Sequence, residues 1–387
     1  MIKKSGFRKN NLKQVDNLFL TLVFSIAAFG LIMVYEASVV YSSDVFGGKY
    51  HFLFLQMGWM FIGLIGMYFL SKADLKIIQK YSVHLFLLSL ILLAIILIPS
   101  VFAPSVYGAK RWLVLNPLPF PMFPIIGRIS FQPSEFAKFA SVIFFASFLS
   151  SLRIKDQGIW QSIIRFNLLM LFVCGLIFIE PDFTTAFILG VILIVMYFLS
   201  NVNIVYFLVA GPMLALGATI YAMSSEYRRE RVQTLLNPES IDKMGAGYHI
   251  RQIMIALGSG GFLGLGLGHS RQKYAYLPEV TTDSIFGVIG EEFGFIGTVL
   301  VVAAFCALIL RGLKIAQKAA DPFSSLLASG IITWIGVQAL INLGAMTRLL
   351  PLTGVPLPLI SYGGSSMIFM LWGLGLVINV SRGNIDR

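Results

Sequence analysis

Long apolar stretches alternate with short polar connections along the whole chain. A helix needs about 20 mainly apolar residues to cross the hydrocarbon core of a bilayer, and most of these stretches approach that length. The pattern predicts an all-α polytopic membrane protein, with 1–387 as a single transmembrane domain. Ten transmembrane helices are expected, over residues 17–40, 50–71, 82–102, 136–152, 163–181, 184–200, 204–223, 284–310, 322–345 and 363–381.

The composition supports a membrane protein. Hydrophobic residues make up 57% of the chain and charged residues only 12%, whereas about a quarter of the residues in soluble domains are charged. The two cysteines, Cys174 and Cys306, lie inside apolar stretches, and the four histidines are scattered without ligand spacing. Neither a disulfide framework nor a built-in structural metal site is expected.

Lysine and arginine are concentrated in every second connection. Short loops rich in these residues stay in the cytoplasm, so both termini are predicted to be cytoplasmic, with a large outward loop between the seventh and eighth helices. The first span lacks a small-residue cleavage site and is expected to be retained. The basic connections are 1–13, 71–80, 152–165, 311–318 and 381–387.

Two long outward segments, 103–135 and 224–282, are also basic. They contain "AKRW", with Lys110 and Arg111, and "YRRER", with Arg228 and Arg229. A net charge of +11 can indicate a nucleic-acid partner, but the topology accounts for the cytoplasmic basic residues, and no nucleic acid is expected. The outward basic residues either bind an anionic ligand or contact anionic lipid headgroups.

The segment "GSGGFLGLGLG", residues 258–268, has enough glycine to mimic a nucleotide-binding loop. That motif requires a preceding strand and a following helix within a βαβ unit, and none is apparent here. No nucleotide cofactor is expected. The glycines instead predict a backbone that bends sharply and packs closely against a neighbour or a ligand.

Four carboxylates, Glu279, Asp283, Glu291 and Glu292, surround the start of the predicted span 284–310. Ionisable groups within a membrane are costly and indicate function. Asp283 lies at the water boundary, where it is either a helix N-cap or a functional carboxylate. The other two span carboxylates lie about 12 Å deeper along a helix axis, and a structural ion pair or hydrogen bond is favoured for them.

The same span carries glycines at Gly287, Gly290, Gly294 and Gly297. Spacings of three and four residues place them on one face of a helix. They predict a smooth ridge against which another helix packs closely.

Further polar clusters face the same side of the predicted membrane. "FQPSEFAK" opens the fourth span, "EPDFTTA" joins the fifth and sixth spans, and "LPLTGVPLPLISYGGSS" approaches the tenth as a non-helical segment. Such backbone is tolerated at membrane depth only where it lines a cavity or is buried in protein. These clusters are expected to form a site for an anionic, membrane-tethered substrate. The candidate substrate-binding residues are Lys110, Arg111, Trp112, Gln132, Ser134, Glu135, Lys138, Asp182, Arg228, Arg229, Lys273 and Ser361.

Five segments together resemble the motifs of the SEDS family, the FtsW, RodA and SpoVE proteins of bacterial wall synthesis. They are "QPSEFAK", "EPDFTTA", "GSGGFLGLGLGHSRQKYAYLPEVTTD", "IGEEFGFIG" and "TGVPLPLISYGGSS", in this order and over nearly the whole chain. The run "GLGHSRQKYAYLPE" is more similar to the FtsW and SpoVE branch than to RodA.

The resemblance implies a peptidoglycan glycosyltransferase that uses lipid II at the outer face of the cytoplasmic membrane. The family's essential carboxylate corresponds to Asp283, and its basic pair and tryptophan correspond to "KRW", including Arg111 and Trp112. An aspartate can accept the proton of the attacking sugar hydroxyl. Basic residues or a divalent cation, Mg²⁺ or Mn²⁺, would take up the charge of the leaving diphosphate.

Partners are also implied by the resemblance: a class B penicillin-binding transpeptidase and other division or elongation proteins. Two rival functions stay open at this point, a lipid II flippase and a non-catalytic scaffold. A flippase needs a polar path that reaches both leaflets, whereas the polar clusters of this chain face outward. A non-catalytic scaffold would not need a functional carboxylate at Asp283.

The chain also departs from the family pattern. Thr281 stands where a histidine is usual beside the essential aspartate, and Ser284 replaces the aromatic residue that follows it. Thr184 and Arg348 each replace a glycine, and Glu36 replaces a small polar residue. A proline-rich insertion precedes "FQPSE" and is expected to stand over the site or contact a partner.

Overall fold

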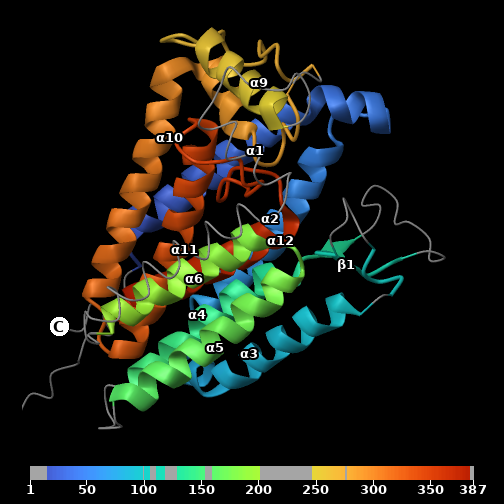
Figure 1. The fold of residues 1–387 in the computed structure, drawn as a ribbon. Helices are drawn as coiled ribbons and strands as arrows, with labels where there is room; N and C mark the ends of the chain where they lie inside the picture. The colour runs from blue at the N-terminus through green and yellow to red at the C-terminus, as the bar shows by residue number, and fades with distance from the viewer. Residues whose placement is uncertain are drawn as a thin grey trace, which may run out of the picture.

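The computed structural model is a bundle of long helices (Figure 1). It describes residues 15–98, 100–104, 110–117, 129–152, 159–200, 246–274 and 277–383. The helices are α1 (Asn17–Phe46), α2 (His51–Leu70), α3 (Leu75–Leu97), α4 (Pro133–Leu152), α5 (Ile159–Ile179), α6 (Phe183–Leu199), α9 (Ala246–Ser259), α10 (Ile285–Gln317), α11 (Pro322–Met346) and α12 (Gly364–Gly383).

A two-residue antiparallel ladder lies beside the bundle. Strands β1 (Leu113–Val114) and β2 (Ser130–Phe131) pair with Leu113 opposite Phe131. The ladder joins β1, which directly follows "KRW", to β2, which lies shortly before the start of α4.

Each predicted span within the described residues coincides with a helix, and the predicted span 204–223 lies outside them. The ends differ. The third span was expected over 82–102, but α3 begins at Leu75, because the Asp74 side chain accepts a hydrogen bond from the Lys76 backbone and caps the helix. Basic residues that read as a connection are therefore helical. The first span was expected over 17–40, but α1 continues to Phe46. It stops at Gly47, whose φ of 69° ends the helix.

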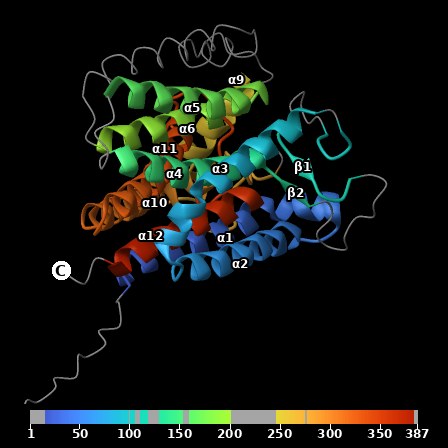
Figure 2. The ribbon, with the colours of Figure 1, turned by 90° about the horizontal axis from the view of Figure 1, so that it is seen from below.

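The core of the bundle is α11. It packs against α10, α4, α6, α12 and α9, and residues such as Trp334 and Ile335 are fully buried. Figure 2 shows α5 and α6 on one side of the bundle and α1 and α2 on the other, with α4, α11 and α12 between them. The helices α2 and α12 approach so closely that a Cβ on Gly375 would lie only 2.6 Å from the Met67 carbonyl oxygen. The absence of a side chain at Gly375 allows this approach.

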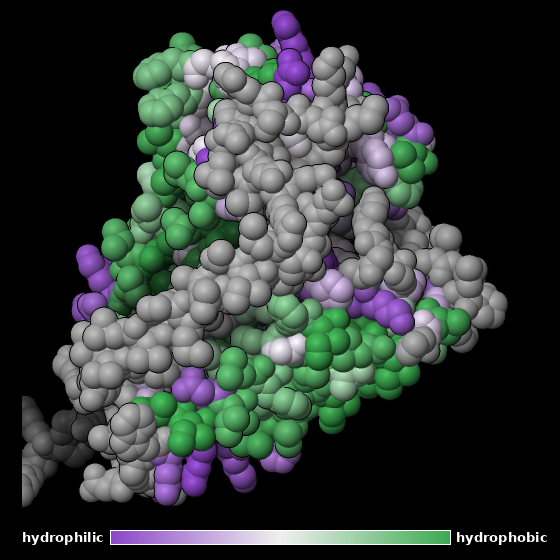
Figure 3. All heavy atoms as spheres, in the orientation of Figure 1, coloured by the Kyte–Doolittle hydropathy of each residue, from purple (hydrophilic) through white to green (hydrophobic). Residues whose placement is uncertain are grey.

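The outer faces of the helices are apolar. Phe61 and Phe69 of α2 are 65% and 66% exposed, which water would not favour but a lipid bilayer would. Six of the described helices, α1, α2, α3, α10, α11 and α12, are long and apolar enough to cross a membrane, and α5 and α6 carry shorter apolar stretches. In Figure 3 the visible hydrophobic surface follows the helices, and hydrophilic residues gather near their ends. The protein is a multi-pass membrane protein.

The bundle has two ends, which take their names from Asp283 and Asp16. The Asp283 end includes the start of α10 and the ends of α1 and α11, and the Asp16 end includes the start of α1 and the ends of α2, α10 and α12.

Near the Asp283 end, α10 is kinked rather than continuous. Gly294 has φ 65° and ψ −160°, a conformation that glycine alone adopts readily. The predicted ridge is thus confirmed at Gly290, where a Cβ would lie 2.3 Å from the Leu257 side chain of α9, but it is wrong beyond that point. The backbone at Gly294 turns away from the helical path.

The glycine-rich segment 258–268 forms backbone hydrogen bonds with α10 on both sides of this kink. Leu265 and Gly266 donate backbone hydrogen bonds to the carbonyls of Glu291 and Glu292, at 2.9 and 3.0 Å. Phe295 donates in return to the Gly261 carbonyl at 2.9 Å. The predicted close packing of this segment is therefore seen, and its contact is another part of the protein.

Candidate active site

Asp283 is the first candidate residue that the fold places. It precedes the N-cap of α10, which is Ser284, and it is only 6% exposed. The hydroxyls of Thr282 and Ser284 each lie 3.5 Å from Asp283 Oδ1. The backbone carbonyl of Asp283 accepts a hydrogen bond of 2.8 Å from Asn342 Nδ2 of α11. Asp283 is therefore not the N-cap residue, and its backbone is fixed from the core of the bundle.

The proline-rich segment 350–363 lies next to this carboxylate. Gly354 has φ 68°, and a Cβ added there would stand 3.9 Å from Asp283 Oδ2. The same Asn342 amide that holds Asp283 also donates to the Val355 carbonyl at 2.8 Å. The predicted non-helical segment is thus observed, and it is attached to the Asp283 backbone through one side chain.

A buried ion pair lies deeper, on α4. Lys138 Nζ is 2.8 Å from Glu135 Oε1 and 3.2 Å from Gln338 Oε1 of α11, and Lys138 is 1% exposed. Gln338 Nε2 donates in turn to the Pro356 carbonyl at 3.0 Å. Consecutive carbonyls of segment 350–363 are therefore held by Gln338 and Asn342, so the ion pair and Asp283 belong to one hydrogen-bonded network.

The start of α4 meets the connection between α5 and α6. Gln132 Nε2 lies 3.4 Å from Asp182 Oδ2, and the Gln132 backbone donates to Ser365 Oγ at 3.0 Å. Asp182 Oδ1 accepts from the Thr185 backbone at 3.2 Å and caps α6. Ser134 is fully buried, and its hydroxyl has no hydrogen-bond partner in the described part of the chain.

The basic pair approaches the same connection. The Arg111 guanidinium hydrogen-bonds the Pro181 carbonyl, while Lys110 and Trp112 are partly exposed beside it. Pro181 has a φ of 31°, which is strained for proline. Arg111 thus reaches a distorted turn that lies one residue from Asp182.

Glu180 also belongs to this turn, outside both helices that it joins. It is 1% exposed, and among the described residues neither carboxylate oxygen has a hydrogen-bond partner. Burial, together with the charge of Asp182, raises the pKa of Glu180 to about 9, although Arg111 opposes the shift. Glu180 is therefore protonated at neutral pH.

Lys273 and Ser361 have structural partners. Lys273 Nζ lies 3.1 Å from Glu36 Oε2 and 3.2 Å from Glu292 Oε1, and Lys273 is 4% exposed. The Ser361 hydroxyl accepts from the Leu357 backbone at 2.8 Å. Lys273 is thus grouped with the kink of α10, whereas Ser361 shapes segment 350–363.

The deeper carboxylates have the structural contacts that were favoured for them. Glu291 accepts hydrogen bonds from Ser270 Oγ and from the backbones of Arg271 and Gln272, at 2.5, 3.1 and 3.2 Å. Together with the Lys273 pair, these bonds fasten 270–273 to α10. The unusual glutamate at position 36 belongs to the same cluster, where Lys273 balances its charge.

Three functional candidates were missed from the sequence. Gln338 and Asn342 are polar residues four apart in an apolar span, a spacing that places them on one helix face and could have marked them. His249 of α9 has its Nε2 2.5 Å from Ser284 Oγ, and no pattern in its own segment points to that contact. Arg228 and Arg229, which were predicted, lie outside the described residues.

The described residues contain no group of three or more His, Cys, Asp or Glu that could hold a metal ion. Asp283 nevertheless offers one carboxylate beside two hydroxyls. Mg²⁺ is commonly bound by one or two carboxylates together with waters and substrate phosphates. These residues fit a cation that arrives with a phosphorylated substrate, and they do not form a complete protein cage.

The fold and site define a multi-pass helical membrane protein with a buried carboxylate, a buried ion pair and a non-helical segment joined in one network. The model of the FtsW, RodA and SpoVE family, described as "Cell cycle protein", matches residues 16–385. The chain belongs to this family, as the resemblance in its motifs predicted.

Two relatives illustrate the match in sequence. The chain is 36% identical to the stage V sporulation protein E of Bacillus subtilis over 372 residues, which cover 95% of this chain and 97% of the relative. It is 35% identical to the probable peptidoglycan glycosyltransferase FtsW of Trichlorobacter lovleyi, over 96% of this chain and 94% of the relative.

Two solved structures share the fold. One belongs to a study titled "Structural coordination of polymerization and crosslinking by a peptidoglycan synthase complex", with a TM-score of 0.75, 26% identity and coverage of 96% of this chain and 99% of the other. The other is the rod shape determining protein RodA of Thermus thermophilus, with a TM-score of 0.69, 26% identity and coverage of 97% and 100%.

Proposed function

We propose that this chain is a peptidoglycan glycosyltransferase that polymerises lipid II, with Asp283 as its general base. Family membership and the names of several relatives support the glycosyltransferase activity. The observation that carries the role of Asp283 is its environment: a buried carboxylate with its backbone fixed by Asn342, beside Gly354, outside the first turn of α10. The flippase alternative is not favoured by these relatives.

The orientation follows from the basic connections. Lys72, Lys76 and Arg382 lie at the Asp16 end, and such residues are retained in the cytoplasm. The Asp283 end then faces outward from the cytoplasmic membrane, and both termini are cytoplasmic. This orientation presents the candidate site to a lipid-linked sugar in the outer leaflet.

The reaction needs a base at the acceptor sugar. As the acceptor 4-hydroxyl oxygen forms its bond to the anomeric carbon of the donor, its proton passes to an Asp283 carboxylate oxygen. The bond from the anomeric carbon to the diphosphate oxygen breaks, and undecaprenyl diphosphate leaves with the electron pair. Attack from the opposite face inverts the anomeric configuration.

The leaving diphosphate gains negative charge that cations must stabilise. Lys110 and Arg111 stand at the rim of the site, where Arg111 contacts the Pro181 carbonyl, and Arg228 and Arg229 are further candidates from the sequence. A divalent cation, Mg²⁺ or Mn²⁺, would be held by Asp283 with the substrate phosphates, and would supply charge neutralisation.

The partner is proposed on similar grounds. One structural neighbour comes from a peptidoglycan synthase complex that coordinates polymerisation with crosslinking. A glycan polymerase of the same fold would work beside a class B penicillin-binding transpeptidase, together with other division or elongation proteins.

The decisive experiment compares two carboxylates close in sequence. Asp283→Asn keeps the size of the side chain but removes the base, so polymerisation of labelled lipid II should fall by about 10²-fold or more. Glu279→Gln is the matched control, because Glu279 is exposed and four residues away. Polymer is measured on a gel, and thermal unfolding checks the fold.

A well-folded Asp283→Asn variant that polymerises at more than about half the normal rate would remove Asp283 from its proposed role. If neither the wild-type chain nor the chain with its transpeptidase forms polymer, while lipid II crosses a vesicle membrane, the protein is a transporter instead.

A further inference from the structure

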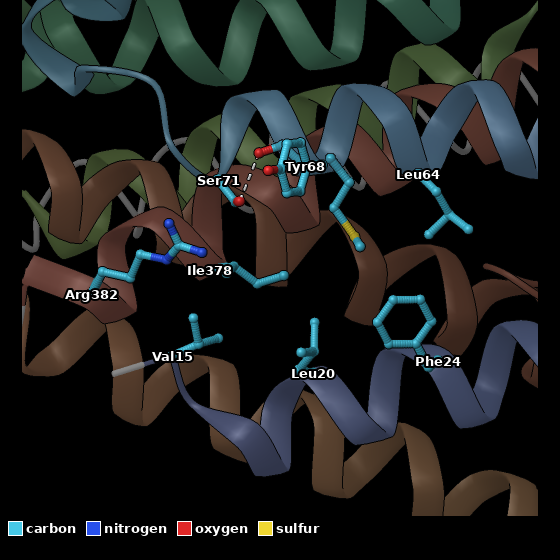
Figure 4. A pocket seen from close by; sticks show the side chains of 9 residues that line it. Val15, Leu20, Phe24, Leu64, Tyr68, Ser71, Ile378 and Arg382 are labelled. Atoms are coloured by element: carbon cyan, nitrogen blue, oxygen red, sulfur yellow. Dashed lines mark hydrogen bonds between the residues drawn. The ribbon is translucent and has the colours of Figure 1, made fainter. Parts of the chain in front are cut away.

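A pocket of about 330 Å³ lies at the Asp16 end, away from the candidate active site. It is formed between α1, α2 and α12, together with Val15 shortly before α1 and Ser71 directly after α2. Figure 4 shows Arg382 and Val15 at one end of this pocket, Ile378 near its middle, and Phe24 and Leu64 at the other end. The lining residues are Val15, Leu20, Phe24, Leu64, Met67, Tyr68, Ser71, Ile378 and Arg382.

The walls of the pocket are mainly apolar. Met67 and Ile378 are buried at its base, 5% and 3% exposed. Phe24 and Tyr68, at 43% and 55% exposed, open it toward the outer face of the bundle. From Leu64 to Ser71 the pocket follows α2 for about 10 Å along the helix axis. The pocket is therefore a groove that runs along α2, inward from the Asp16 end. An acyl chain of a surrounding bilayer would run in the same direction.

One end of the groove carries a cation with unused bonding capacity. Arg382 belongs to the last turn of α12, and within the described residues its enclosed Nε has no hydrogen-bond acceptor. An arginine guanidinium presents its donors in a fork that matches a phosphate group. The polar groups beside it are already used, since the Ser71 hydroxyl donates to the Tyr68 carbonyl at 2.8 Å.

Neighbouring carboxylates are engaged elsewhere. Asp16 pairs with Arg311 at 2.8 Å, and Asp74 accepts from the Lys76 backbone at the start of α3. Lys72 contacts the Tyr68 ring and hydroxyl on the exposed side of the groove. The sequence that leads into Val15, residues 1–14, has five basic residues and no acidic residue. Among the described residues, Arg382 and Lys72 therefore make the rim of the groove basic.

We propose that this groove binds one anionic phospholipid of the cytoplasmic leaflet. Its acyl chain lies against Leu20, Leu64 and Met67, and its phosphate accepts hydrogen bonds from Arg382. Basic residues near the membrane surface attract the anionic lipids of this leaflet, and an apolar groove open to the bilayer accepts the chain. The proposal rests on the proposed orientation, and it does not depend on the glycosyltransferase reaction.

The basic composition of residues 1–14 argues against the N-terminal tail as the occupant. An N-terminal tail without acidic residues offers no anionic side chain to Arg382. A phospholipid satisfies both halves of the site at once, because it joins an anion to an alkyl chain.

Native mass spectrometry of the full-length chain in detergent, titrated with phosphatidylglycerol or phosphatidylcholine, tests the proposal. One phosphatidylglycerol should be retained preferentially. Arg382→Gln should weaken this binding about fivefold, the usual effect of one basic residue at an anionic surface. Lys80→Gln is the matched control, an exposed basic residue of the same end outside the groove, and should leave it unchanged.

A second measurement locates the lipid. Leu64→Trp places an indole in the groove, and its fluorescence should be quenched more by phosphatidylglycerol brominated on its acyl chain than by brominated phosphatidylcholine. Arg382→Gln in this background should reduce the difference, in line with the weaker binding. Wild-type chain supplies the background of the five native tryptophans.

Equal quenching by the two lipids, or unchanged phosphatidylglycerol retention in Arg382→Gln, would overturn the proposal. Failure of the wild-type chain to retain any phosphatidylglycerol would also overturn it, and would leave the tail as the occupant. A chain that binds the lipid but makes no glycan would refute the proposed enzyme function alone.

Discussion

His249 of α9 hydrogen-bonds Ser284, the residue directly after Asp283, with 2.5 Å between His249 Nε2 and Ser284 Oγ. Ser284 Oγ in turn lies 3.5 Å from Asp283 Oδ1. In this chain Thr281 stands where the family usually has a histidine, and Ser284 stands where an aromatic residue is usual. A histidine from a different helix thus reaches the neighbourhood of the carboxylate that lacks its usual neighbour.

This contact predicts a dependence of turnover on His249. His249→Ala removes the partner of the Ser284 hydroxyl and should slow lipid II polymerisation by up to about tenfold, the effect of one hydrogen bond. His249→Gln can still bond the hydroxyl and should recover most of the loss. The lipid II concentration for half-maximal rate should stay constant in both. Equal rates for all three proteins would make the contact structural only.

Arg111 is expected to serve the diphosphate. Arg111→Gln should raise the lipid II concentration needed for half-maximal rate at least about tenfold, because a charge-assisted hydrogen bond to an anion contributes on the order of 1.5–3 kcal/mol. Lys49→Gln is the control, an exposed basic residue in the connection between α1 and α2. Unchanged kinetics for both variants would assign the outward basic residues to lipid headgroups.

Glu180 predicts a pH-dependent stability. Its pKa is raised from an ordinary 4.5 to about 9, so between these values the folded state holds a proton that the unfolded state has released. Stability should therefore fall as pH rises through this window, by about 1.4 kcal/mol per pH unit. Glu180→Gln cannot ionise, so its thermal unfolding temperature should fall less between pH 6 and 8.5. Parallel curves for the variant and wild type would contradict the assignment.

The Glu135 and Lys138 pair predicts a strong asymmetry between single and double variants. Lys138→Met leaves a buried carboxylate unpaired and should destabilise the fold by about 3–5 kcal/mol. Glu135→Leu combined with Lys138→Met should restore most of the unfolding temperature. Polymerisation should remain low in the double variant, since both residues are candidate substrate-binding groups. A double variant with full activity would reduce the pair to a structural role.

Gly294 is expected to tolerate no side chain. A Cβ at this position would lie 2.4 Å from the Gly264 backbone nitrogen, and its φ of 65° disfavours other residues. Gly294→Ala should lower the yield of folded protein and the unfolding temperature. Gly175→Ala is the matched control, since a Cβ there meets no atom within 4 Å. Similar unfolding temperatures for the two variants would contradict the close packing of the kink.

The sequence predicted the spans well because hydrophobicity depends on local composition alone. The partners of the polar residues could not be predicted in the same way, because they are distant in sequence. Lys273 and Glu36 are 237 residues apart, and Asn342 reaches a carbonyl 59 residues away. Residue types marked Asp283 and segment 350–363 as unusual, but only the fold shows that one amide holds both.

That amide has a consequence for the temperature dependence of the proposed reaction. The Asn342 side chain fixes the backbones at Asp283 and Val355 when the protein folds, so the entropy of ordering them is lost before any substrate arrives. Binding then needs to immobilise only the sugar and its lipid carrier. Mutations that loosen this anchorage should therefore make the activation entropy more unfavourable, even where the Asp283 side chain is intact.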